Sequence, residues 1–208
     1  GTLIAIFPTP VVKYKYNSSI DTELKYIEGI EWKKVQLSNK FLTKDSYLTK
    51  HEQLKDLTTF FKECIEDYAL NVYQSKQRLV ITQLWGNRNP RGSIHPEHNH
   101  PNSILSGVFY LRQDSTQPEI VFIRPVRYGL ALELDPEMSN PLNSSVQGLP
   151  CETGELIIFP SSMQHGVPIN EGSEDRISLS FNTFSIDELG SEEELTHLDI
   201  KRLIDENS

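Results

Sequence analysis

From residue 79 onward the apolar residues follow the two-residue period of β-strands, and this pattern constrains the fold more than any other feature of the chain. The runs are short, rich in Val, Ile, Phe and Tyr, and bounded by Gly, Pro, Asn or Ser. No long helical pattern interrupts them before the C-terminal tail, which is typical of an antiparallel sandwich or barrel. The predicted strands are residues 79–85, 104–111, 119–123, 130–134, 155–159 and 176–184.

One long helix is predicted before these strands. Residues 51–74 carry apolar side chains at three- and four-residue spacing, which form one stripe on an amphipathic helix and suit packing against a sheet. Thr49 and Glu52 make an S/T-x-x-E capping signature at its start. Cys64 lies within the stripe, so we expect it to behave as a buried small hydrophobe.

The two ends of the chain predict smaller elements. Residues 3–7 and 11–16 resemble a strand broken by prolines, which suits the edge of a sheet, and residues 21–30 predict a short helix. The tail at 191–207 predicts a final acidic helix with a solvated outer face. Residues 135–148 are rich in Pro, Asn, Ser and Gly, and this long loop could act as a lid or serve only as a connection.

We expect a single domain of 208 residues, because no internal repeat and no linker divides the chain. Within it we distinguish an N-terminal strand and helical region at 1–78, a core at 79–184 and a tail at 185–208.

Charge and composition exclude several classes of partner. The net charge of −9 and the lack of a Lys/Arg cluster argue against nucleic acid or an anionic membrane as the main partner. No apolar run approaches the roughly 18 residues of a membrane span. Cys64 and Cys151 suit a reducing compartment, no secretory signal is present, and Gly1 in place of Met indicates a trimmed end, so we predict a cytoplasmic protein.

Residues 95–101, HPEHNHP, hold three of the six histidines and a carboxylate. His98 and His100 are two residues apart, and alternate side chains of an extended strand point to one face, so both imidazoles could reach one ion. No cysteine takes part, and a nitrogen ligand set suits iron, copper, nickel or zinc. The alternative is a polar loop that is rich in histidine.

His165 and Arg176 come late in the chain and complete a candidate pocket. His165 follows a buried strand that ends at Pro160, where a rigid sheet could aim it at the centre of a barrel. On the strand that Arg176 begins, Ile177, Leu179 and Phe181 share one face, and Arg176 shares the other with polar residues. This polar face, Arg176, Ser178, Ser180 and Asn182, could line a pocket in which the guanidinium holds a carboxylate. The alternative is the solvent side of an edge strand.

Taken together, these residues resemble the family of iron(II)- and 2-oxoglutarate-dependent oxygenases, prolyl-hydroxylase-like in type, that is common in marine bacteria and their phages. The resemblance covers most of the chain and rests on an ordered series of blocks: FPTP at 7–10, WGN at 85–87, HNHPNS at 98–103, LSGVFYL at 105–111, GELIIFPSS at 154–162, then His165, RIS at 176–178 and FN at 181–182. It implies a mainly β fold, a double-stranded β-helix or jelly-roll core with N- and C-terminal helices packed outside. It also implies that His98 and His165 bind iron and that Arg176 binds the far carboxylate of 2-oxoglutarate.

Two departures from the wider superfamily concern the site. Most such oxygenases use two histidines and one carboxylate, with the acid two residues after the first histidine. Here His100 occupies that position, so either three imidazoles hold the iron or the acid is Glu97. We favour His98, His100 and His165. In addition, Arg124 precedes Pro125 where related sequences tend to carry an acidic residue.

The resemblance implies an Fe(II)-dependent dioxygenase that converts 2-oxoglutarate to succinate and carbon dioxide while hydroxylating an unidentified prime substrate. Tyr110, Asn87 and Ser178 are candidate cosubstrate-binding groups beside Arg176. A cytoplasmic location would mean the bacterial host cell if the gene is carried by a phage, and a homodimer is compatible with the sequence. Two alternatives stay open: a cupin-like metalloenzyme that needs no keto acid, and a degenerate binding module without catalysis.

Overall fold

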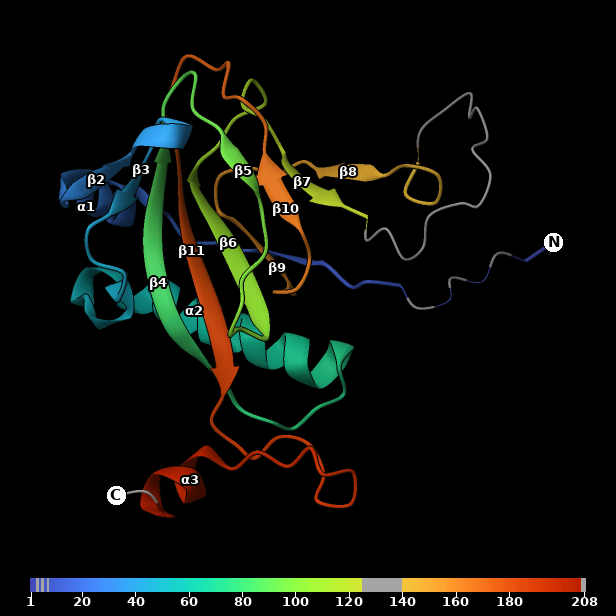
Figure 1. Ribbon diagram of the computed structural model, residues 1–208. Coiled ribbons are helices and arrows are strands. Elements are labelled where there is room, and N and C mark those ends of the chain that lie inside the picture. Colours follow the sequence, from blue (N-terminus) through green and yellow to red (C-terminus); the bar gives the residue numbers. More distant parts are fainter. Residues whose placement is uncertain (3, 5, 7, 125–139, 207–208) are drawn as a thin grey trace.

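The computed structural model describes residues 1–2, 4, 6, 8–124 and 140–206, and within them two antiparallel sheets face each other (Figure 1). The seven-stranded sheet has the order β1 (Val12–Lys15), β9 (Glu155–Pro160), β6 (Leu105–Arg112), β11 (Arg176–Ser185), β4 (Leu79–Asn89), β3 (Lys40–Thr43) and β2 (Trp32–Val35). The four-stranded sheet has the order β5 (His95–His98), β10 (His165–Val167), β7 (Ile120–Ile123) and β8 (Val146–Leu149). This is a jelly-roll sandwich, as predicted.

The helices cover the face of the large sheet that points away from the small one. Helix α2 (Lys55–Asp67) lies across β4, β11 and β6 in Figure 1, and α1 (Asp21–Gly29) packs nearby. Their apolar side chains form one core with the sheet. The fully buried members include Leu57, Phe61, Tyr68, Leu84, Phe109, Leu179 and Phe181. The short helices are η1 (Gln36–Ser38), η2 (Leu48–Lys50), η3 (Glu52–Leu54), the π-helical η4 (Tyr68–Val72) and α3 (Ile200–Glu206).

The strand period of β11 explains how this core and a polar cavity share one sheet. Ile177, Leu179 and Phe181 alternate toward the helices. The Phe181 ring lies directly over Gly107 on β6, where an added Cβ would collide with it, so glycine is required at that position. The intervening residues of β11 therefore point toward the small sheet.

A second apolar cluster joins the two sheets at one end of the sandwich. Val108, Tyr110, Ile157 and Phe159 of the large sheet pack there against the small sheet. Phe122 of the small sheet contacts Phe159 with ring centroids 5.1 Å apart. Because this cluster fills only part of the space between the sheets, a cavity is left beside it.

Most of the predicted elements are confirmed. The strands expected around 79–85, 104–111, 119–123, 155–159 and 176–184 are β4, β6, β7, β9 and β11, and β1 lies at the edge of its sheet. The short helix at 21–30 is α1, with Ile27 fully buried. Cys64 is buried and free, and so is Cys151. In the part of the chain that the structure describes, no helix has both the length and the apolar character needed to cross a membrane.

Two predictions at helix ends are wrong. The signature at Thr49 and Glu52 does not cap the long helix, since α2 begins after Leu54 without a side-chain capping bond. The chain enters it through two 3-10 turns that bury Leu48 and Leu54 completely. The tail is helical only over α3, because the turn at 192–195 ends at Leu195, whose left-handed φ of 56° does not continue into a helix.

Short strands were not predicted from the sequence: β2, β3, β5 and β10 have four residues or fewer, and β8 begins inside the expected 135–148 loop. The strand expected at 130–134 lies outside the described residues, as do residues 135–139 and Pro125. The lid role of the loop and the division at residues 78 and 184 stay predictions.

Candidate functional site

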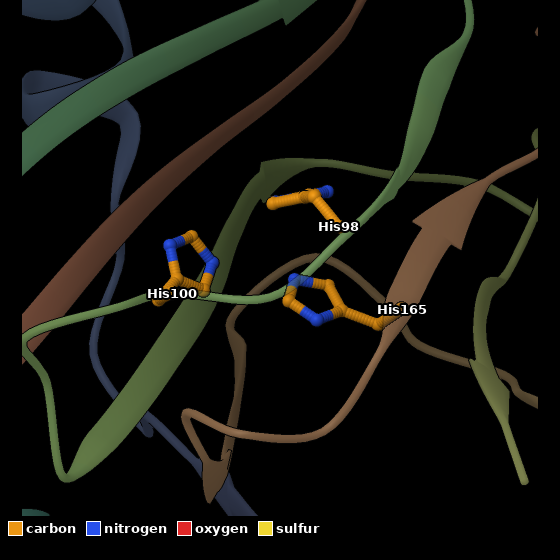
Figure 2. Close-up of side chains that lie close together, drawn as sticks. All are labelled: His98, His100 and His165. Atoms are coloured by element: carbon orange, nitrogen blue, oxygen red, sulfur yellow. The ribbon is translucent and has the colours of Figure 1, made fainter. Parts of the chain in front are cut away.

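Strands β5 and β10 bring the three predicted histidines together. His98 and His165 are direct partners across the two antiparallel strands, and their ring centroids lie 4.4 Å apart. His100 lies two residues beyond β5, where its backbone N–H donates to the Ser161 carbonyl at 3.0 Å. Its ring centroid is 4.9 Å from that of His98 and 5.1 Å from that of His165. Figure 2 shows the three rings gathered around one space.

Backbone carbonyls set the tautomers of two of these rings. His98 Nδ1 lies 2.8 Å from the Pro96 carbonyl oxygen, and His165 Nδ1 lies 2.9 Å from that of Met163. A carbonyl can only accept, so each Nδ1 carries the proton and donates it. Each Nε2 is then left with a free lone pair, which is the arrangement that orients histidine ligands in metal sites.

The environment keeps all three imidazoles neutral. Burial, reinforced by its histidine neighbours, lowers the pKa of His100 to about 3, and burial lowers that of His165 to about 4. Burial also lowers the pKa of His98, although the bond to Pro96 opposes the shift. Since only the neutral ring binds a metal, the site is ready for one at neutral pH.

The donor set fits a transition metal with nitrogen ligands. The candidate ligand atoms of His98, His100 and His165 all lie within 4.8 Å of one another. Two nitrogens that each bind one ion at about 2.1 Å are at most about 4.2 Å apart, so small ring movements would complete the site. Among the described residues no carboxylate or thiol joins this group, and Glu97 is exposed.

We therefore expect the Glu97→Gln variant to bind iron as well as the wild type does. The substitution removes only an exposed carboxylate outside the histidine group, so iron affinity should stay within about twofold of wild type. Metal content after iron loading and gel filtration measures this. His100→Gln is the matched comparison and should lose iron; strong loss in Glu97→Gln instead would make the carboxylate the third ligand.

The same cavity, of about 220 Å³, is also lined by Arg176. The Arg176 side chain is 2% exposed, its Nε–H donates to Gln113 Oε1 at 2.8 Å, and its guanidinium lies 5.1 Å from the centre of the Tyr110 ring. No acidic side chain among the described residues pairs with it. An unpaired buried guanidinium is unfavourable, so this end of the cavity suits an anionic ligand. Ser178 and Ser180 continue the cavity wall, and β11 is a central strand, not an edge.

The other predicted cosubstrate groups take different places. Asn87 and Ser178 line the cavity, and Asn87 donates to Ser180 Oγ at 3.0 Å while its Oδ1 has no partner. Tyr110 lies beneath Arg176, outside the wall, with its hydroxyl also lacking a partner. Burial raises the pKa of the Tyr110 phenol, so the hydroxyl stays a donor.

Three residues of the site were missed in the sequence. Lys40 and His95 line the cavity, and Gln113 orients Arg176. His95 stacks on His98 with ring centroids 4.5 Å apart and planes 9° from parallel. It is not one of the three histidines whose ligand atoms all lie within 4.8 Å of one another. A signal existed only for His95, in the histidine-rich motif; nothing marks Lys40 or Gln113 in a single sequence.

Residues 83–182 match the sequence model of a family described as "Putative 2OG-Fe(II) oxygenase". That span contains all three clustered histidines and Arg176. It confirms the resemblance inferred from the sequence, while the link to marine bacteria and phages stays a prediction. A search of curated proteins finds no match.

Solved structures share the fold. The "non-heme alpha ketoglutarate dependent epimerase SnoN from nogalamycin biosynthesis" has a TM-score of 0.66 and 11% identity over 86% of this chain and 77% of its own. HygX from Streptomyces hygroscopicus, solved with nickel, 2-oxoglutarate and hygromycin B bound, has a TM-score of 0.62 and 11% identity over 84% and 82%. A Pseudomonas putida prolyl-4-hydroxylase has 0.56 and 11% over 84% and 92%. At these identities the likeness establishes the jelly-roll fold alone.

Proposed function

We propose that this chain, whose residues 83–182 match the 2OG-Fe(II) oxygenase family, is an iron(II)- and 2-oxoglutarate-dependent dioxygenase that hydroxylates an unidentified substrate. One observation carries the proposal: a single cavity holds three neutral imidazoles at one place and an unpaired, buried guanidinium at another. A keto acid that chelates a metal and carries a second carboxylate is complementary to both.

His98, His100 and His165 would hold the iron through their ring nitrogens. The Pro96 and Met163 carbonyls fix two of the rings, so those residues need little reorganisation to bind. Three protein ligands would leave room on the ion for a chelating keto acid and O₂. When bound, iron(II) supplies the oxidative chemistry in which the keto acid becomes succinate and carbon dioxide.

Arg176 would orient the far carboxylate of the keto acid. Gln113 holds the Nε of its guanidinium and the Tyr110 ring supports its face, which leaves the terminal N–H groups free to form two parallel bonds. The free Oδ1 of Asn87 and the hydroxyl of Ser178 add polar groups along the wall. The wall also includes Leu42 and Val108, whose apolar side chains help to exclude water.

The cupin-like alternative explains less of the cavity. Three histidines alone would serve many metal-dependent reactions, but without a dicarboxylic ligand the Arg176 guanidinium has no anion to bind. A degenerate module would not need the carbonyl bonds that orient the rings of His98 and His165.

We expect the iron-loaded protein to convert 2-oxoglutarate to succinate in air. Turnover should be slow without the prime substrate, and it should require iron, because the histidine group is the one cluster of potential metal ligands among the described residues. Chromatographic measurement of succinate tests this, with the His165→Ala variant and chelated protein as controls. Succinate formation at the same rate in the wild type, the His165→Ala variant and the chelated protein would contradict the proposed function.

A further inference from the structure

A second cation, Lys40, lies in the cavity wall with Arg176. Lys40 is 7% exposed and is the first residue of β3. Among the described residues none forms a hydrogen bond or ion pair with its ammonium group, which reaches the cavity. Lysine is seldom buried without a partner, so this position needs an explanation.

Strand register places Lys40 and Arg176 at the same level of the sheet. Arg176 is the partner of Asn89 across β11 and β4. Phe41 pairs with Arg88 across β3 and β4, so Lys40 lies opposite Asn89 one step further along. Lys40, Asn89 and Arg176 thus form a row across β3, β4 and β11, and cross-strand partners point to the same face. The outer two strands, β3 and β11, are about 10 Å apart. Two long side chains can reach one point from that distance.

The middle residue of the row, Asn89, also has a side-chain atom without a hydrogen-bond partner. Asn89 is 3% exposed, and its side-chain oxygen has no hydrogen-bond partner. An amide oxygen only accepts hydrogen bonds, so it suits the N–H donors of the two cations and not a carboxylate. The groups of the row that complement a carboxylate are the ammonium of Lys40 and the guanidinium of Arg176.

Electrostatics agree with an anion at this place. Burial and the nearby Arg176 guanidinium lower the pKa of the Lys40 amine to about 8. A negative charge between the two side chains would offset both effects, because it stabilises the charged amine. The groups that face Lys40 are otherwise cationic or neutral: Arg176, His95, His98 and His100.

We propose that Lys40 is a cosubstrate-binding residue that grips, together with Arg176, the far carboxylate of the bound keto acid. This rests on the proposed function. Lys40 shares its level of the sheet with Arg176, which favours this role, but its ammonium also faces His98 and His100. A contact of Lys40 to the prime substrate is therefore the competing role, and the test below distinguishes the two.

The test compares two keto acids that differ only at the far end. 2-Oxoglutarate and 2-oxopentanoate share the chelating head and chain length, but the second has a methyl group in place of the far carboxylate. Each is titrated by calorimetry into anaerobic, nickel-loaded wild type, Lys40→Met and Lys33→Met. Lys33 is an exposed lysine on the neighbouring strand β2 and serves as the matched control.

We expect Lys40→Met to weaken 2-oxoglutarate binding by about tenfold or more, with 2-oxopentanoate and the Lys33→Met control unaffected. Removing an unpaired buried cation should not lower the melting temperature of the metal-free variant, so a folding defect is separable; Lys40→Gln provides a second variant. Unchanged 2-oxoglutarate affinity, or equal weakening for both acids, would overturn the role of Lys40. If wild type itself does not prefer 2-oxoglutarate, the proposed function fails instead.

Discussion

Replacing either His98 or His165 by alanine is expected to remove most of the bound iron while leaving the fold intact. Each contributes one of only three clustered ligand nitrogens among the described residues. Changing a residue that merely supports a ligand typically weakens metal binding roughly 10- to 100-fold, and losing a ligand should exceed that. Metal analysis of iron-loaded, desalted protein measures the effect.

His197→Ala is the matched control for these variants. It removes an imidazole of the C-terminal tail that contacts Glu188, far from the cavity lining, so iron content should equal that of wild type. Circular dichroism and thermal melting establish that each variant is folded. Full metal occupancy in both His98→Ala and His165→Ala would refute the site.

Arg176→Lys is expected to weaken 2-oxoglutarate binding while iron binding changes little. Lysine keeps the positive charge but loses the planar fork and the bond to Gln113. The loss should be on the order of 1.5–3 kcal/mol, or about ten- to a hundredfold in affinity. Calorimetric titration of anaerobic, iron-loaded protein with 2-oxoglutarate measures it.

Arg112→Lys provides the comparison for that variant. Arg112 lies on β6 and pairs with Glu28 at the surface, so the same substitution there should leave cosubstrate affinity unchanged. Equal binding by wild type and Arg176→Lys would contradict the assigned role. Absence of binding by both would favour the cupin-like reading of the cavity.

The sequence predicts well those elements in which a hydrophobic period runs over many consecutive residues. Strand β11 alternates without exception from Arg176 to Phe181, so its polar face could be assigned to a cavity before any strand pairing was known. Helix α2 carries a complete apolar stripe. The H-x-H motif identified two members of the histidine group directly, and His165 followed from its place after a buried strand.

The parts that could not be predicted depend on pairing between distant segments. Strand β3 has only four residues, and it becomes a strand because β4 offers a free edge. Lys40 therefore looks like an ordinary surface lysine in the sequence, and only the register opposite Asn89 shows where it points. The capping signature at Thr49 failed for a related reason, since burial of Leu48 and Leu54 overrode a local preference.

The histidines and Arg176 belong to different layers of the sandwich, the former to the small sheet and its extension and the latter to the large one. An acid bound at both ends would bridge the two layers. The distance between the layers would then select the length of the acid, because an acid one methylene shorter or longer could not bind at the histidine site and at Arg176 at the same time. Packing between Phe122 and Phe159, which fixes that thickness nearby, would in this way take part in choosing the acid although neither ring touches it.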